Sequence, residues 1–213
     1  MSQVVCIMGE SGAGKTTSLR NLDPKQTYII DADKKGLSWK GWKTQYNLEK
    51  VNYMKASDPT VVRSLIKNIA EKAAHVKTII IDTVNGIMVD DEMKRSKEKG
   101  FDKWADMASC IWELVSEAHM YRDDLTIIFV AHVQTEKDDS GVVWSRIKTS
   151  GKKLDKIVLE SKFTTVLFSR CVDGKYIFET QSRNSTAKSP MGAFEEFEID
   201  NDISIVIDAL KEF

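Results

Sequence analysis

The stretch VVCIMGESGAGKTT, residues 4–17, decides the fold. Val4 to Met8 form an apolar run, which predicts a short buried parallel strand. Gly9 to Thr16 match the pattern G-x-x-x-x-G-K-[ST], in which a glycine-rich turn points successive backbone N–H groups at one anion. The next residues, Thr17 to Arg20, can continue as a helix whose N-terminal dipole favours an anion. Strand, turn and helix in this order predict a loop that binds the phosphates of a nucleotide.

This phosphate loop also predicts how a nucleotide and Mg²⁺ would be held. Lys15 is expected to reach the β- and γ-phosphates, and Thr16 to bind Mg²⁺. A second carboxylate for the Mg²⁺ shell is expected at the end of a neighbouring strand, where the run TIIID provides Asp82. The alternative for Asp82 is a helix cap, since a strand followed by Asp and a helix gives the same pattern. The residues expected to contact the nucleotide are Gly9, Glu10, Ser11, Gly12, Ala13, Gly14, Lys15, Thr16 and Thr17.

Composition limits the class of protein. The 213 residues are 42% hydrophobic and 30% charged, which suits one globular domain spanning residues 1–213. The net charge of −1 excludes bulk attraction to nucleic acid or an anionic membrane, so such a contact needs a local patch. The three cysteines are far apart, which argues against a disulfide framework and for a reducing compartment. No apolar run approaches the roughly 18 residues that cross a bilayer, and none resembles a signal peptide, so we expect a cytoplasmic location and no membrane contact.

Alternation of strand and helix patterns predicts the fold class. Apolar, mostly β-branched runs at 28–30, 78–81, 126–130 and 164–168 indicate buried strands, and residues 59–74, 105–120 and 203–210 indicate helices. Strands that alternate with helices predict a mostly parallel sheet. The dipeptide Asp173-Gly174 between two apolar runs predicts a β-hairpin. The expected class is therefore α/β, with helices flanking the sheet and a C-terminal antiparallel extension.

Two segments show neither the helical nor the strand period of apolar residues. Residues 94–103 are highly charged and are expected to be an exposed helix end or a loop, and residues 135–153 are polar and are expected to be a mobile loop. An aromatic ring and several cations in the second segment suit single-stranded nucleic acid, although an ordinary solvated loop would have the same composition. A second mixed patch, residues 39–46, could bind DNA or form a subunit interface. The expected DNA contacts are Trp144, Arg146, Lys148, Lys152 and Lys153.

Polar residues also follow two other predicted strands. Asp31 and Asp33 follow the strand at 28–30, and one of them could orient an attacking water molecule; the alternative is a solvated turn. His132 ends the strand at 126–130, at the sheet edge where ligands bind in open α/β sheets. It could sense the γ-phosphate, or it could be a structural hydrogen-bonding histidine.

These pieces, in this order, resemble the RecA family of recombination ATPases from Val4 to about Phe197. The short length resembles the trimmed RecA-like ATPases of bacteriophages, which are associated with single-strand annealing and recombination. The resemblance implies a RecA-like core that binds ATP and Mg²⁺ and hydrolyses ATP. It also implies action on single-stranded DNA in recombination, annealing or replication, and a location in the cytoplasm of a bacterial host.

The resemblance assigns further roles to single residues. Asp33 lies where the family has a catalytic glutamate, with Asp31 as the alternative, and His132 replaces the family's glutamine sensor of the γ-phosphate. Arg183 and Lys188 lie in a segment that resembles the one reaching the neighbouring subunit's nucleotide. The implied partners are single-stranded DNA, further copies of the chain and a single-strand-binding protein.

Two other function classes fit the phosphate loop. A nucleotide or small-molecule kinase also combines this loop with an α/β sheet, but usually adds an arginine-rich lid, and Arg146 is the only arginine between Arg122 and Arg170. A nucleotide-gated interaction module would bind partners with little turnover. Measuring ATP hydrolysis with and without single-stranded DNA separates the three.

Overall fold

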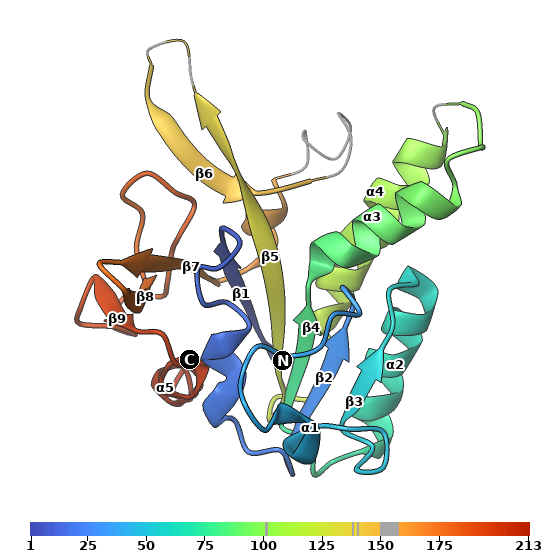
Figure 1. Cartoon of the computed structure of the whole chain (residues 1–213), viewed down its shortest axis with the longest axis horizontal. Helices are drawn as coiled ribbons and strands as arrows, with labels where there is room; N and C mark the ends of the chain where they lie inside the picture. Colours follow the sequence, from blue (N-terminus) through green and yellow to red (C-terminus); the bar gives the residue numbers. More distant parts are fainter. Residues whose placement is uncertain (101, 138, 140, 150–157) are drawn as a thin grey trace.

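The computed structural model of the chain describes residues 1–100, 102–137, 139, 141–149 and 158–213. Within these residues, nine strands form one sheet in the order β3-β2-β4-β5-β1-β7-β8-β9, with β6 paired to β5 (Figure 1). The strands are β1 (Gln3–Gly9), β2 (Thr27–Asp31), β3 (Tyr53–Lys55), β4 (Thr78–Asp82), β5 (Thr126–Lys137), β6 (Val143–Ile147), β7 (Thr165–Val172), β8 (Lys175–Glu179) and β9 (Glu198–Asp200).

The direction of the strands confirms the expected fold class. The pairs β3–β2, β2–β4, β4–β5, β5–β1 and β1–β7 are all parallel. Strands β7, β8 and β9 pair antiparallel at the C-terminal side. The turn between β7 and β8 is the predicted Asp173-Gly174, and both residues have positive φ angles, 51° and 80°, as the tight hairpin turn requires. The sheet is thus a parallel α/β core with an antiparallel extension.

Helices cover both faces of this sheet, because side chains along each strand alternate between two cores. On β1, Cys6 and Met8 face one core, whereas Val5 and Ile7 face the other. The first core packs under α2 (Pro59–Lys72), α3 (Val84–Lys94) and α4 (Asp102–Ala118). The second packs under η1 (Thr17–Asn21), α1 (Trp42–Gln45) and α5 (Ile203–Ala209), and a further short turn, η3 (Leu159–Lys162), precedes β7.

The helices predicted at 59–74, 105–120 and 203–210 are confirmed as α2, α4 and α5. The start of α2 follows from its sequence, since the Asp58 carboxylate accepts the backbone N–H groups of Thr60 and Val61 and Pro59 fills the first turn. The charged segment that ends α3 and precedes α4 was expected as a helix end or loop, and the turn after Lys94 agrees with it. None of the helices in the described ranges is long and apolar enough to cross a membrane.

The helix expected at Thr17 to Arg20 needs one correction. It is a short 3₁₀ helix, Thr17–Asn21, that ends at Leu22 in an extended conformation. The sequence Asp23-Pro24 follows at once, and the residue before a proline avoids the helical region. A turn of this length adds little dipole, so anion binding here depends on the N–H groups of the loop itself and on Lys15.

The second correction concerns residues 135–153, which were expected to form a mobile loop. In the described part, Thr135 to Lys137 extend β5, and Val143–Ile147 form β6, which pairs antiparallel with it. The hairpin is held at its base, because Ile147 is 1% exposed in the first core and its N–H donates to the Glu160 carboxylate at 2.6 Å. Figure 1 shows this hairpin projecting beyond the parallel sheet.

Candidate functional site

The phosphate loop and three polar strand ends meet at one edge of the sheet. Strand β5 lies between β1 and β4, and the register places Gly9 opposite His132. On the other side, Asp82 of β4 is opposite Val130 of β5 and Asp31 of β2. The parallel strands therefore end side by side, as the sequence predicted for the carboxyl edge of such a sheet.

The loop is shaped by glycine and supported from β7 and from the turn before α5. Gly14 has φ +94°, and a Cβ there would lie 2.7 Å from the Tyr176 ring. The Ser169 hydroxyl donates to the Ala13 carbonyl at 2.6 Å, and the Asn201 amide donates to Ser169 at 3.0 Å. Sequence reasoning missed Ser169 and Asn201. The only sequence signal for Ser169 is a hydroxyl at the end of an apolar strand.

Lys15 is folded onto its own loop. Its Nζ donates to the carbonyls of Gly9 at 2.8 Å and Glu10 at 2.7 Å. Burial lowers the pKa of Lys15 to about 8, the charge of Asp82 opposes this, and Lys35 adds to the lowering. A buried ammonium held by neutral partners is well placed to turn to an incoming phosphate, whose charge would favour its protonated form.

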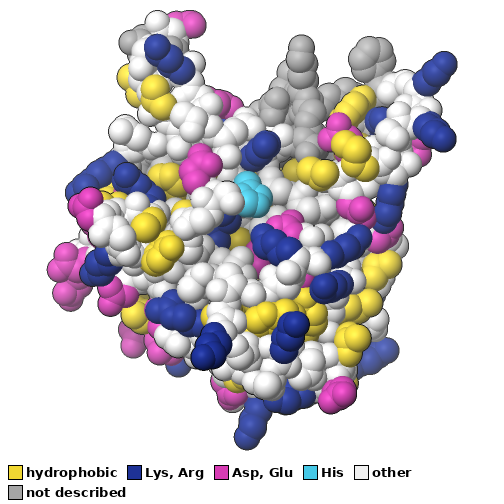
Figure 2. All heavy atoms as spheres, in the orientation of Figure 1, with side chains coloured by type: hydrophobic (Ala, Val, Ile, Leu, Met, Phe, Trp, Pro, Cys, Tyr) yellow, Lys and Arg dark blue, Asp and Glu magenta, His cyan; other side chains and the backbone are white. Residues whose placement is uncertain are grey.

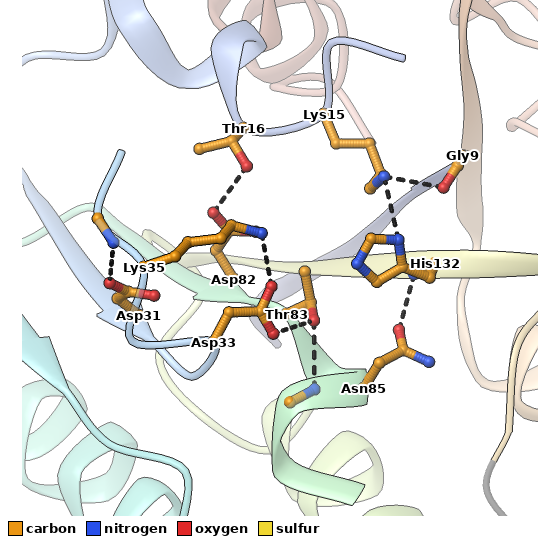
Figure 3. A network of polar contacts seen from close by, with 12 residues as sticks. Gly9, Lys15, Thr16, Asp31, Asp33, Lys35, Asp82, Thr83, Asn85 and His132 are labelled. Atoms are coloured by element: carbon orange, nitrogen blue, oxygen red, sulfur yellow. Dashed lines mark hydrogen bonds and ion pairs between the residues drawn. The ribbon is translucent and has the colours of Figure 1, made fainter. Parts of the chain in front are cut away.

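Thr16 and Asp82 form the contact expected of a Mg²⁺ site. The Thr16 hydroxyl donates to Asp82 Oδ2 at 2.8 Å (Figure 3). Asp82 is fully buried, and its Oδ1 has no hydrogen-bond partner in the described part of the chain. Burial raises the pKa of Asp82 to about 6 against the lowering effects of Lys35 and Thr16. An ionised carboxylate with an unused buried oxygen beside a threonine hydroxyl fits one side of a Mg²⁺ shell.

The rest of such a shell would come from the nucleotide and water. Among the described residues, no three His, Cys, Asp or Glu side chains gather into a metal-binding group. Mg²⁺ in nucleotide sites is typically bound by one or two protein ligands together with phosphate oxygens and waters. Thr16 and Asp82 are therefore a sufficient protein contribution.

The two acids at and just after the end of β2, Asp31 and Asp33, differ in their surroundings. Asp31 is fully buried, and its Oδ2 accepts the N–H of Gly36 at 2.8 Å and the hydroxyl of Tyr53 at 2.5 Å. Asp33 is partly exposed, accepts the Thr83 hydroxyl at 2.9 Å and pairs with Lys35 Nζ at 2.5 Å. Asp31 thus holds a turn together, whereas Asp33 faces the site.

Close packing brings α3 against this second acid. A Cβ on Gly86, in the first turn of α3, would lie 2.5 Å from Asp33 Oδ1 and 2.8 Å from the Ala32 carbonyl. The Thr83 side chain caps the same helix by accepting the Gly86 N–H at 3.2 Å. Glycine at this position lets the helix start approach the turn that presents Asp33.

His132 faces Lys15 and is fixed from behind by Asn85. Its Nδ1 lies 3.5 Å from Lys15 Nζ, and burial, followed by the Lys15 charge, lowers the pKa of His132 below 6.5. A neutral ring can accept from Lys15 through Nδ1, and in that tautomer it carries its proton on Nε2. The Asn85 side chain accepts the backbone N–H of His132 at 2.7 Å and donates to the backbone carbonyl of Lys148 at 2.6 Å. It therefore joins β5 to the end of the hairpin. Sequence reasoning missed Asn85.

A cleft of about 660 Å³ opens next to these groups. It runs from Glu10 and Ser11 of the loop past Asp33 and His132 to α3 and Lys148. Figure 2 shows this face, where basic and acidic side chains gather around a histidine. The space is large enough for a nucleotide phosphate chain and a second group beside it.

Comparison with protein families identifies the fold. A family model described as AAA domain matches residues 1–191. The chain belongs to this family. AAA-type domains are nucleotide-binding ATPases of the phosphate-loop class, so the match agrees with the loop, the Thr16–Asp82 contact and the α/β sheet. No curated protein matches the chain.

Apart from Arg146, the remaining predicted residues in the described ranges are exposed or partly exposed. Arg183 is exposed, stacks on Phe197 and pairs with Glu198 at 3.7 Å, and the backbone of Lys188 pairs with β7. Lys148 is exposed and Trp144 is partly buried.

The position of Arg146 in the hairpin does not fit the DNA contact that was expected of it. Arg146 was predicted to contact DNA, but its side chain is 9% exposed and pairs with Glu136 at 3.3 Å, within the hairpin. Lys152 and Lys153 lie outside the described residues.

Proposed function

We propose that the chain binds ATP with Mg²⁺, hydrolyses it, and uses this turnover to act on single-stranded DNA in recombination, annealing or replication. The main support is the Thr16–Asp82 hydrogen bond beside Lys15, because it brings a metal ligand from the loop to a metal ligand from β4. Membership of the AAA-domain family supports the ATPase part. The RecA-like and bacteriophage resemblance adds the DNA part and rests on motifs alone.

The nucleotide-binding residues have separate tasks. Loop N–H groups between Gly9 and Thr16 bind phosphate oxygens, and Lys15 leaves the carbonyls of its loop for the β- and γ-phosphates. Thr16 and Asp82 would hold Mg²⁺ beside the phosphates, and the metal would supply positive charge that stabilises phosphoryl transfer. His132, which is neutral, senses the terminal phosphate through its Nε2 proton or through Lys15.

We assign the general base to Asp33 rather than Asp31. Asp33 lines the cleft and is partly exposed, whereas Asp31 is buried and already accepts two hydrogen bonds in a turn. A water molecule held by Asp33 gives up a proton to it as the water oxygen bonds to the γ-phosphorus. The bond to the bridging oxygen breaks, and ADP and phosphate leave.

The DNA part of the proposal uses the hairpin of β5 and β6. It projects next to the cleft, with exposed Lys148 at its base and the Trp144 ring on β6. Lysines can bind phosphates, and an aromatic ring can stack on a base. Arg146 contributes to the hairpin's own stability through Glu136, and we place the DNA-contacting charge at Lys148, Lys152 and Lys153.

We also propose that hydrolysis requires a homo-oligomer, in which Arg183 and Lys188 of one copy contact the nucleotide of its neighbour. The Arg183 side chain is exposed and is held by Phe197 and Glu198, so another copy of the chain could reach it. A cation supplied in this way contributes about 10³–10⁵-fold in other phosphate-loop enzymes. Mixing the inactive Arg183→Ala/Lys188→Ala protein with inactive Lys15→Ala protein should restore part of the activity. No recovery in demonstrably mixed oligomers would contradict this arrangement.

The proposed function is tested by measuring phosphate release with Mg²⁺, with EDTA and with added single-stranded DNA. We expect release that needs Mg²⁺, rises with DNA and is lost in Lys15→Ala. Asp33→Asn should slow turnover by about 10²-fold or more while it weakens ATP binding little, because a base acts on the transition state. Release only when a small phosphate acceptor is added would instead identify a kinase. Tight binding without release would identify a nucleotide-gated module.

A further inference from the structure

The turn that follows β2 is built to aim one lysine into the site. Lys34 has φ +59° and Gly36 has φ +86°, both in the left-handed region that a non-glycine residue such as Lys34 seldom adopts. The buried Asp31 carboxylate fixes the far side of this turn by accepting the Gly36 N–H and the Tyr53 hydroxyl. A conformation of this kind persists only where its surroundings hold it. The direction of Lys35 is therefore set by the turn.

Lys35 reaches the acids of the site. Its Nζ lies 2.5 Å from Asp33 Oδ2, and Figure 3 shows its side chain extending past Asp82 toward Asp33. Its charge also acts on Asp82, Lys15 and His132. After burial, it is the largest influence on the pKa of Asp82, and it is the main like-charge influence on Lys15. The ammonium thus lies among the residues assigned to phosphate, metal and water.

The ion pair with Lys35 limits the access of water to Asp33, the assigned general base. One oxygen of Asp33 accepts the Thr83 hydroxyl and the other is paired to Lys35, so the ammonium competes with water for this carboxylate. A triphosphate with one Mg²⁺ adds about two net negative charges to the site, and the metal's own charge repels an ammonium near Asp82. Both effects favour movement of Lys35 from the carboxylate to the terminal phosphate.

We propose that Lys35 is a phosphate-binding catalytic residue, acting within its own subunit, that neutralises Asp33 in the nucleotide-free protein and transfers to the γ-phosphate when Mg-ATP binds. The transfer frees the Asp33 carboxylate to hold the attacking water and places a cation on the phosphate that gains charge in the transition state. This inference rests on the proposed ATP site and adds a residue that its motifs do not contain.

The neighbouring lysine provides a matched control. Lys34 belongs to the same turn, and its side chain is 50% exposed, compared with 49% for Lys35. Lys34 also lines the cleft, but its Nζ lies 3.7 Å from Asp90 of α3 rather than beside Asp33. Replacing either lysine with methionine removes one charge from the same turn, so a difference between the two variants reports the position of Lys35 and not the loss of charge.

The test compares binding of ADP with binding of an ATP analogue that has an imido bridge between the β- and γ-phosphates. Isothermal titration calorimetry with Mg²⁺ measures both affinities for the parent, Lys35→Met, Lys35→Arg and Lys34→Met proteins. Only the analogue has a γ-phosphate. We expect Lys35→Met to weaken the analogue about tenfold and ADP less than about twofold, as the loss of one charge-assisted hydrogen bond predicts. Lys35→Arg should recover most of the analogue's affinity, and Lys34→Met should behave as the parent.

The outcomes separate this inference from the proposed function. Equal weakening of both nucleotides by Lys35→Met, or no weakening of either, would refute a contact with the γ-phosphate while the ATP site stands. Failure of the parent to bind either nucleotide would overturn the ATP site and this inference with it. Circular dichroism melting controls for folding, and if Lys35→Met unfolds, Lys35→Gln and Lys35→Arg provide the same comparison with polar side chains.

Discussion

Asp82→Asn is expected to stabilise the nucleotide-free protein while it removes a metal ligand. Burial raises the pKa of Asp82 from 3.8 to about 6, so the folded protein holds this proton more tightly than the unfolded chain does. The free energy of unfolding therefore falls as the pH rises through this interval and is constant above it. The difference corresponds to about 3 kcal/mol at 25 °C for ionised Asp82 above pH 6. Asparagine has no such cost, and its side-chain carbonyl can still accept the Thr16 hydroxyl.

Urea unfolding in EDTA, followed by far-ultraviolet circular dichroism, measures this difference at several pH values. The Asp82→Asn protein should match the parent near pH 4 and exceed its stability by about 3 kcal/mol at pH 8. Asp123→Asn, on an exposed turn, removes the same charge without burial and should show no such trend. A stability difference that is independent of pH, or a less stable Asp82→Asn protein at pH 8, would refute the buried, ionised carboxylate. Calorimetric titration should show that the same variant loses most of the Mg²⁺ dependence of nucleotide binding.

Two further substitutions probe how α3 meets the site. In an ordinary helix Gly→Ala stabilises by up to about 1 kcal/mol, but Gly86→Ala should lower the melting temperature, because its Cβ would lie 2.8 Å from the Ala32 carbonyl. A higher melting temperature would show that this contact yields easily. Asn85→Asp keeps the acceptor for the His132 N–H but loses the donor to the Lys148 carbonyl. DNA stimulation should therefore fall while ATP hydrolysis without DNA changes less than about threefold, and equal loss of both would place Asn85 in the nucleotide site alone.

Local signals in the sequence were sufficient for the elements whose pattern has one physical cause. The Asp58 carboxylate and Pro59 mark the start of α2, because the free N–H groups of a first turn need an acceptor. Asp173-Gly174 marks a hairpin, since a tight turn needs positive φ angles. The phosphate loop combines both kinds of signal, so its position between β1 and the next element was predictable.

Other parts depend on contacts between distant residues and gave no local signal. The hairpin of β5 and β6 was read as a solvated loop because charge usually indicates exposure. Here Arg146 lies opposite Gln134 and pairs diagonally with Glu136 on the neighbouring strand, so a charged residue is buried. The start of α3 has only a short apolar run before its charged second half, so no helical period stands out. The role of Lys35 was missed because it follows from the shape of one turn, which no spacing of residue types reveals.

Strand β5 is one continuous element with two surroundings. Residues 126–130 pair with β1 on one side and β4 on the other, residues 131–132 pair only with β1, and residues 133–137 pair only with β6. His132 lies at the boundary between these two parts, so a change of strand direction there would begin at the candidate nucleotide site. The segment of β5 from His132 to Lys137 is about 17 Å long. A tilt of about 10° at His132 would displace Lys137 by about 3 Å. A small change of angle beside His132 would thus become a much larger displacement at Lys137.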